Sequence, residues 1–188
     1  MFGKKDKEKT TAEKIRGEVK KQSTRNLSEK VAYLVPGYHG YKAKEIRREA
    51  DKALRTYIYK QLKDCKKDLN LVQEMLVDYN VENTWEQMDR LMALVDRVAE
   101  RINHADYGYS GFFDSTKIRE PELDRMYEFD AMILDDIDAF RGEIKSLKEE
   151  LESGNFDNSF QRVFSLRRTL DDIDKKFGDR RSYMLEFV

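Results

Sequence analysis

The chain has 188 residues, of which 39% are apolar and an equal 39% are charged. That balance is typical of long helices with a narrow buried seam and argues against a compact α/β enzyme, as do only nine glycines and two prolines. The single cysteine, Cys65, excludes an internal disulfide framework and indicates a reducing compartment. No stretch approaches the ~18 apolar residues of a membrane span, and residues 1–9 lack the apolar core of a signal peptide. We therefore expect a cytoplasmic protein without a transmembrane segment.

Charge is divided unevenly along the chain. Residues 1–67 contain 20 Lys and Arg against 9 Asp and Glu, whereas residues 68–188 contain 16 against 28. The formal net charge of −1 therefore conceals a strong dipole. A basic N-terminal third is typical of a chain that docks on an anionic surface such as a phosphate backbone, acidic lipid headgroups or an acidic protein.

The first predicted element is a basic arm, residues 1–34. Residues 1–9 are charged and low in complexity, which predicts disorder. Residues 10–34 show a thin apolar stripe at helical spacing, which predicts a weak amphipathic helix that needs a partner. The sequence Val35-Pro36-Gly37 then ends the pattern, because proline disfavours helix in the residue before it.

Residues 42–188 predict an all-α fold, an elongated up-down-up-down bundle of four helices with coiled-coil-like seams. Apolar residues at spacings of three and four extend over 42–79, 84–105, 121–153 and from 160 to at least 177. Thr84 and Gln87 suggest a capping box, and Pro121 suits a first helical position. Short turns at 80–83 and 153–156 would lie at one end.

Residue counts from those turns allow positions on different helices to be compared, at about 1.5 Å of rise per residue. The second of these helices, 84–105, is the shortest, so we expect it to stop before its neighbours do. The aromatic residues of 107–113 would then fill the uncovered end of the core. Alternatively, residues 107–113 and 36–41 converge into a recognition surface, where glycines allow close backbone approach.

Asp130 occupies a seam position of an otherwise apolar helix, where an ionised side chain needs a partner. The same count predicts a buried polar node with Arg180 or Arg181 as the first choice, then His104, then Tyr57. Such nodes usually fix helix register, although a ligand-binding or pH-sensing role is the alternative because histidine titrates near neutrality.

Catalytic and metal-binding patterns are absent from the sequence. The two histidines, His39 and His104, do not form the Glu-x-x-His pairs of di-iron bundles, and Cys65 has no second cysteine for a zinc site. Neither a phosphate-binding loop nor a dinucleotide fingerprint occurs. We therefore expect no cofactor, no metal and no enzymatic activity.

Two functional classes remain. In the first, a helical scaffold or adaptor binds a protein partner or self-associates, and its basic arm docks on an anionic membrane surface, which would place it at the inner face of the membrane. In the second, a nucleic-acid or ribonucleoprotein binder uses the basic stretch 42–55 with tyrosines for stacking. A solvated helix face is the plain alternative for 42–55. The predicted surface-binding residues are Lys4, Lys5, Lys7, Lys9, Lys20, Lys21, Tyr38, Tyr41, Lys42, Lys44, Arg47 and Arg48.

Overall fold

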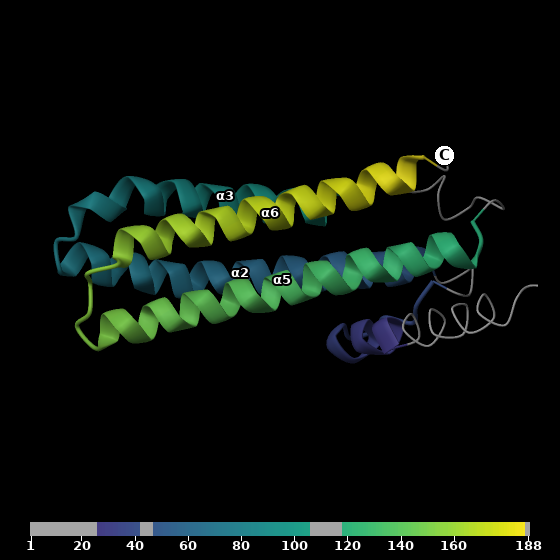
Figure 1. The fold of residues 1–188 in the computed structure, drawn as a ribbon, viewed down its shortest axis with the longest axis horizontal. Helices are drawn as coiled ribbons and strands as arrows, with labels where there is room; N and C mark the ends of the chain where they lie inside the picture. Colours follow the sequence, from purple (N-terminus) through teal and green to yellow (C-terminus); the bar gives the residue numbers. More distant parts are fainter. Residues whose placement is uncertain (1–25, 42–46, 106–117, 187–188) are drawn as a thin grey trace, which may run out of the picture.

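A computed structural model describes residues 26–41, 47–105 and 118–186, and it is helical almost throughout. The named elements are α2 (Arg47–Asp78), the 3-10 turn η2 (Glu82–Thr84), α3 (Trp85–Asn103), α5 (Glu120–Glu152) and α6 (Ser159–Leu185) (Figure 1). Residues 26–34 are helical as well, and the described ranges contain no strand. The predicted all-α class is confirmed.

The four long helices form an elongated bundle. α2 packs on α3 and α5, and α6 packs on the same two helices (Figure 1). The α2–α3 and α5–α6 turns lie at one end, where the rings of Tyr79 and Phe156 are 4.4 Å apart between centroids. α2 and α5 therefore run towards this turn end, and α3 and α6 run away from it.

Local chemistry accounts for the helix ends, with one correction to the predicted caps. Asn80 and Gly154 adopt left-handed backbone conformations, with φ of 57° and 82°, which end α2 and α5. The backbone N–H of Arg119 donates to Glu122 at the start of α5, next to Pro121. The capping box at Thr84 is wrong, because Thr84 has a helical backbone and its hydroxyl donates backwards to the Val81 carbonyl at 2.7 Å.

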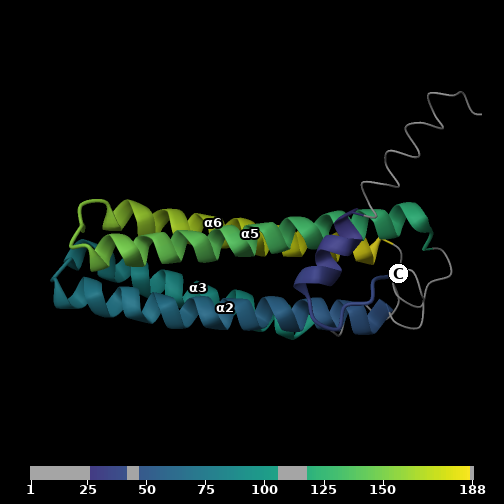
Figure 2. The same ribbon diagram turned by 90° about the horizontal axis from the view of Figure 1, so that it is seen from below.

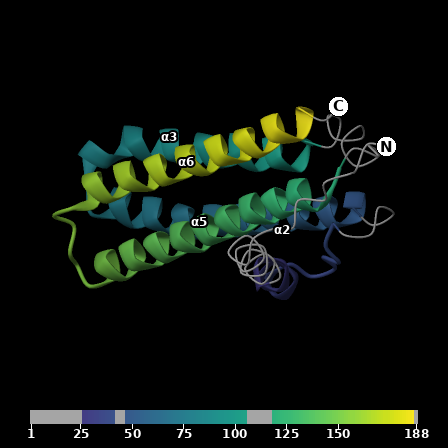
Figure 3. The same ribbon diagram turned by 45° about the vertical axis from the view of Figure 1, so that its right-hand side comes forward.

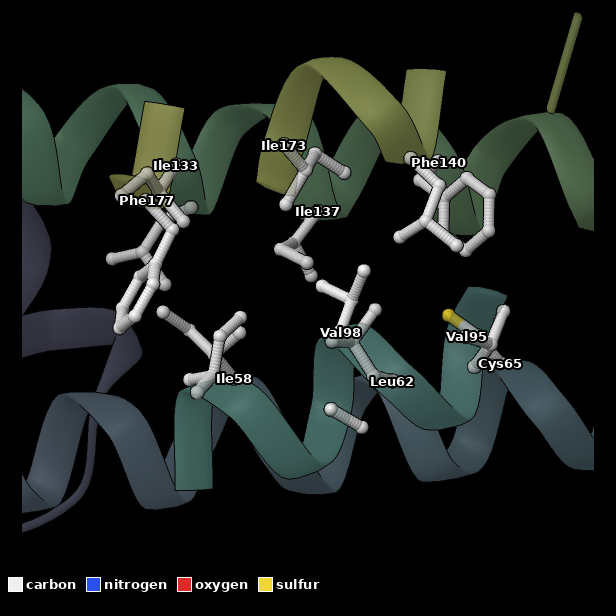
Figure 4. Close-up of a cluster of buried hydrophobic side chains, with 14 of the residues drawn as sticks. Ile58, Leu62, Cys65, Val95, Val98, Ile133, Ile137, Phe140, Ile173 and Phe177 are labelled. Atoms are coloured by element: carbon white, nitrogen blue, oxygen red, sulfur yellow. The ribbon is translucent and has the colours of Figure 1, made fainter. Parts of the chain in front are cut away.

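The core is a continuous apolar seam along the bundle axis. Its central layers take side chains from all four helices, and the free thiol of Cys65 lies among them (Figure 4). Burial of apolar area in such layers is the main source of stability. The residues labelled in Figure 4 are Ile58, Leu62, Cys65, Val95, Val98, Ile133, Ile137, Phe140, Ile173 and Phe177, all of them buried.

Residues 26–41 belong to the same core. Their helical part lies over α2 and α5, away from the turns (Figures 2 and 3), and Lys30 forms an ion pair of 2.5 Å with Asp135 of α5. Val31 and Val35, which straddle the end of the predicted arm, are completely buried. The predictions for residues 1–25 and 107–113 lie outside the described residues. None of the described helices has an apolar stretch long enough to span a bilayer.

α3 has 19 residues, whereas α2 has 32 and α5 has 33, so α3 stops well before its neighbours, as the sequence predicts. Its last residue is Asn103. Beyond that point the bundle lacks a fourth full-length helix among the described residues. This is the level at which Asp130 lies.

Candidate functional site

The buried polar node is centred on Asp130 of α5, whose side chain is completely buried. Its Oδ1 accepts a hydrogen bond from Nε of Arg180 at 2.8 Å. Its Oδ2 accepts from the hydroxyl of Tyr41 at 2.7 Å and from that of Tyr38 at 3.2 Å. Three donors from two other segments thus hold one carboxylate.

Arg180 of α6 extends the node to α2. Its Nη2 donates to Oδ1 of Asp51 at 2.8 Å and to the Tyr41 hydroxyl at 2.9 Å. The second oxygen of Asp51 accepts from Nε of Arg55 at 2.8 Å. Among the described residues, two carboxylates therefore face the guanidinium groups of Arg55 and Arg180, which gives each buried ion a partner of opposite charge.

The same network reaches the end of α3. Nη1 of Arg55 donates to the main-chain carbonyl of Asn103 at 3.0 Å, one of the carbonyls that a helix C-terminus leaves without a partner. A cation at this end also complements the helix dipole. The node consequently joins α2, α3, α5, α6 and residues 38–41.

The backbone around Tyr41 is held by two further side chains. Its N–H donates to the Tyr127 hydroxyl at 2.7 Å, and its carbonyl accepts from Nε of Arg47 at 2.7 Å. Gly40 allows the Tyr127 hydroxyl to lie this close to the backbone, because a Cβ at position 40 would be 2.8 Å from the Tyr127 oxygen. Gly40 also has a φ of +79°, which glycine adopts without strain.

Electrostatics indicate a closed site. Burial raises the pKa of the Tyr41 and Tyr38 hydroxyls well above their ordinary value, so both remain protonated donors at neutral pH. Burial also raises the pKa of the Asp130 carboxyl, and Arg180 and Tyr41 oppose that shift. In the described residues, the only buried side-chain polar atoms without a hydrogen bond are Arg162 Nε and Asp174 Oδ1, both outside the node. Within the described residues, the node therefore contains no buried side-chain polar atom that lacks a hydrogen-bond partner.

The predicted pair Asp130 and Arg180 is confirmed by these contacts, but the other candidates are wrong. Arg181 is exposed, because one residue along a helix rotates the side chain by about 100°. The His104 side chain is 71% exposed and lies 3.4 Å from Glu100. Tyr57 is only half-buried, and the hydroxyl donors to Asp130 come from Tyr41 and Tyr38.

Sequence reasoning missed Asp51 and Arg55 in this role. The signal was present, since they lie four residues apart and the apolar positions Leu54 and Ile58 flank them on the same face of α2. The predicted surface role of Tyr38 and Tyr41 is also wrong, because they are 4% and 0% exposed.

Of the remaining predicted surface residues, two can be placed. Arg47 is buried and contacts Tyr41, so it is not available to a partner, whereas Arg48 is exposed. The other predicted residues fall outside the described part of the chain: Lys4, Lys5, Lys7, Lys9, Lys20, Lys21, Lys42 and Lys44.

A second polar region is an open groove between α3 and α6. The groove has a volume of about 320 Å³ and is lined by Arg90, Ala93, Leu94, Arg97, Arg167 and Asp171. Nη1 of Arg167 donates to Gln87 at 2.9 Å, and the Arg167 guanidinium lies 5.1 Å from the centroid of the Phe164 ring. In the described residues no group of three or more His, Cys, Asp or Glu could hold a metal ion.

The turn end carries exposed apolar side chains. Tyr79 is 64% exposed and Trp85 is 38% exposed, one at each side of the α2–α3 turn. Val77, Phe160 and Phe164 are also exposed on the adjoining helices. We call these five residues the turn-end apolar group.

The described residues form an all-helical bundle whose helices are joined by the buried ion network around Asp130. No family model, no curated protein and no solved structure matches the chain. Functional inference therefore depends on the surfaces of the molecule alone.

Proposed function

We propose that the protein is a non-enzymatic helical scaffold or adaptor that binds a protein partner or a second copy of itself. In this proposal the basic N-terminal segment docks on an anionic surface such as a membrane. The observation that carries it is the turn-end apolar group, in which Tyr79 and Trp85 are exposed although the core of the bundle is complete without them.

Aromatic residues of this kind are enriched at the centres of protein interfaces, where burial of a large ring contributes much of the binding energy. The charges next to Tyr79 and Trp85 in the sequence are acidic, namely Asp78, Glu82 and Glu86, whereas Arg167 lies over the Phe164 ring. An aromatic surface with acidic groups around Tyr79 and Trp85 is a poor match for anionic lipid or nucleic acid, so a protein is the better occupant.

Fewer observations support the alternative of a nucleic-acid-binding protein. It requires Tyr38 and Tyr41 for base stacking, and both rings are buried. Arg47 and Arg55 direct hydrogen bonds into the core, which leaves Arg48 and Lys52 exposed in the described part of 42–55. Two cations are a weak electrostatic footprint for a phosphate backbone.

Crosslinking at the turn end tests the partner proposal. A photoreactive amino acid at position 79 should capture a protein whose yield falls severalfold when Trp85→Ser is added. Tyr33, which is 89% exposed on another part of the molecule, provides the matched control position. Identical products from positions 79 and 33, or products unaffected by Trp85→Ser, would refute the proposal.

Vesicle binding tests the role of the N-terminal segment separately. Replacement of Lys4, Lys5, Lys7 and Lys9 by Gln, together with Lys20 and Lys21, should weaken sedimentation with acidic vesicles severalfold, because lysines close to an anionic membrane are attracted to its headgroups. Binding that is insensitive both to these changes and to salt would remove the segment from the functional account.

A further inference from the structure

The groove between α3 and α6 has the form of a docking site with two defined ends. Arg90 and Arg97 are seven residues apart on α3, which corresponds to about 10 Å along the helix. Leu94 lies between them as an apolar floor. At the far end, Arg101 Nη1 bridges to Asp174 Oδ2 at 2.9 Å and ties the two helices together. At the turn end, Phe160 and Phe164 flank the groove on α6.

The charge of this groove contrasts with the acidic sequence around it. Three guanidinium groups and one carboxylate line it, although residues 68–188 as a whole carry 16 cations against 28 anions. Within the described residues, Arg97 has no ion-pair partner. Arginine presents a planar fork of donors that matches a carboxylate, so the groove suits an acidic segment that also brings an apolar side chain to Leu94.

Such a segment is present on α2 of the same chain. Residues 68–78 contain Asp68, Glu74 and Asp78 and neither Lys nor Arg. All three acids are exposed and have no ion-pair partner in the described part of the chain, and the apolar Leu71 between them is 42% exposed. The segment covers about 15 Å of helix, similar to the distance from Arg90 to Arg101. We call these four residues the acidic stripe.

We propose that the protein associates head to tail, with the acidic stripe of one copy seated in the arginine groove of the next. This rests on the proposed scaffold function and specifies a second copy as a partner. The three carboxylates would face the three guanidinium groups, of which that of Arg90 also pairs with the exposed Glu86 on α3. Leu71 would cover Leu94. The occupant is a second copy because this chain itself carries both complementary surfaces.

The two surfaces cannot satisfy each other within one bundle. α2 packs on α3 and α5, and the acidic stripe faces solvent, whereas the groove opens between α3 and α6. The contact is therefore heterologous, and each added copy leaves one stripe and one groove available. Contacts of this type build open chains or closed rings, not isolated dimers.

Sedimentation equilibrium of the full chain tests this association. Mass should increase with protein concentration at about 0.05 M salt and decrease towards the monomer at about 0.5 M, because salt screens exposed charges. Arg97→Glu should weaken the association about tenfold. Lys145→Glu on α5 is the matched control, since it makes the same change of charge at a 79% exposed side chain on a helix that contributes to neither surface, and it should leave the mass unchanged.

Charge reversal on both surfaces gives the decisive comparison. Glu74→Lys with Asp78→Lys should dissociate the chains as Arg97→Glu does, and the chain with all three changes should associate again. Unchanged thermal unfolding of each variant would show that the fold is retained. A wild-type monomer at every concentration, equal effects of Arg97→Glu and Lys145→Glu, or no recovery in the triple variant would overturn the inference. The crosslinking experiment at position 79 would still decide the scaffold proposal by itself.

Discussion

The half of the bundle next to the turns and the half next to residues 38–41 share α2, α5 and α6 but bury different side chains. Near the turns α3 is present and the core layers are apolar, as around Cys65 and Phe140. At the other end α3 has stopped at Asn103, and a non-helical segment enters the core. There, among the described residues, the core contains two aspartates and three arginines.

The difference shows which backbone groups need new hydrogen-bond partners when a non-helical segment enters the core of a helical bundle. A continuous helix satisfies its own backbone, whereas a helix end or a loop brings unpaired N–H and C=O groups into the core. Three such groups are present, the Asn103 carbonyl and the N–H and carbonyl of Tyr41. Arg55, Tyr127 and Arg47 bind them in that order. The polar node thus accompanies the loss of regular helix.

Removal of Arg180 should be the most damaging change at the polar end. Arg180→Met leaves Asp130 and Asp51 each without a principal donor, so we expect the free energy of unfolding to fall by about 3–5 kcal/mol. The double variant Asp130→Leu with Arg180→Met should lose less, because it removes the Asp130 carboxylate and leaves Asp51 with Arg55 as a donor. Urea denaturation followed by circular dichroism measures both, and a double variant less stable than Arg180→Met would contradict this account.

The thiol of Cys65 reports whether the two halves unfold together. Burial raises the pKa of Cys65 to about 12, so at pH 8 the folded thiol is protonated and inaccessible. Its labelling should therefore follow unfolding, and Arg180→Met should accelerate it by roughly two to three powers of ten. Unchanged labelling in a destabilised variant would mean that the polar end opens by itself.

The same substitution should have opposite effects at two glycines. Gly40→Ala places a Cβ 2.8 Å from the Tyr127 oxygen at a φ of +79°, so it should destabilise by about 1–3 kcal/mol. Gly142→Ala in α5 meets no atom within 4 Å and should stabilise by up to about 1 kcal/mol through helix propensity. Thermal unfolding compares them, and equal shifts would show that the approach of Gly40 to Tyr127 does not matter.

A surface ion pair should contribute least. Asp96 of α3 binds Lys66 and Lys63 of α2, but its side chain is 40% exposed, so Asp96→Asn should cost less than about 1 kcal/mol. The Lys66 ammonium lowers the pKa of Asp96 below 3.8. The contribution is therefore present above that pH and is lost as the pH falls through the lowered pKa. Wild type and variant should converge in acid, and a difference that grows there would have the wrong sign.

Several features of this protein could be predicted from the sequence because they depend on local patterns. Apolar spacing determined the helices, and the predicted turn at 153–156 and Pro121 marked ends that the structure confirms. Helix lengths were sufficient to predict that α3 would stop early. They also ranked Arg180 first, together with Arg181, as the partner of Asp130.

Rotation about each helix and the path of non-helical segments were decided only by the tertiary structure. A residue count gives the level of a side chain but not its direction, so Arg181 could not be separated from Arg180 beforehand. Tyr38 and Tyr41 look like surface residues beside a proline and two glycines, yet the structure buries them against Asp130 and Arg180. The physical reason is that periodicity encodes which face of a regular element is apolar, whereas a buried network is selected by partners that are distant in sequence and meet only when the helices pack.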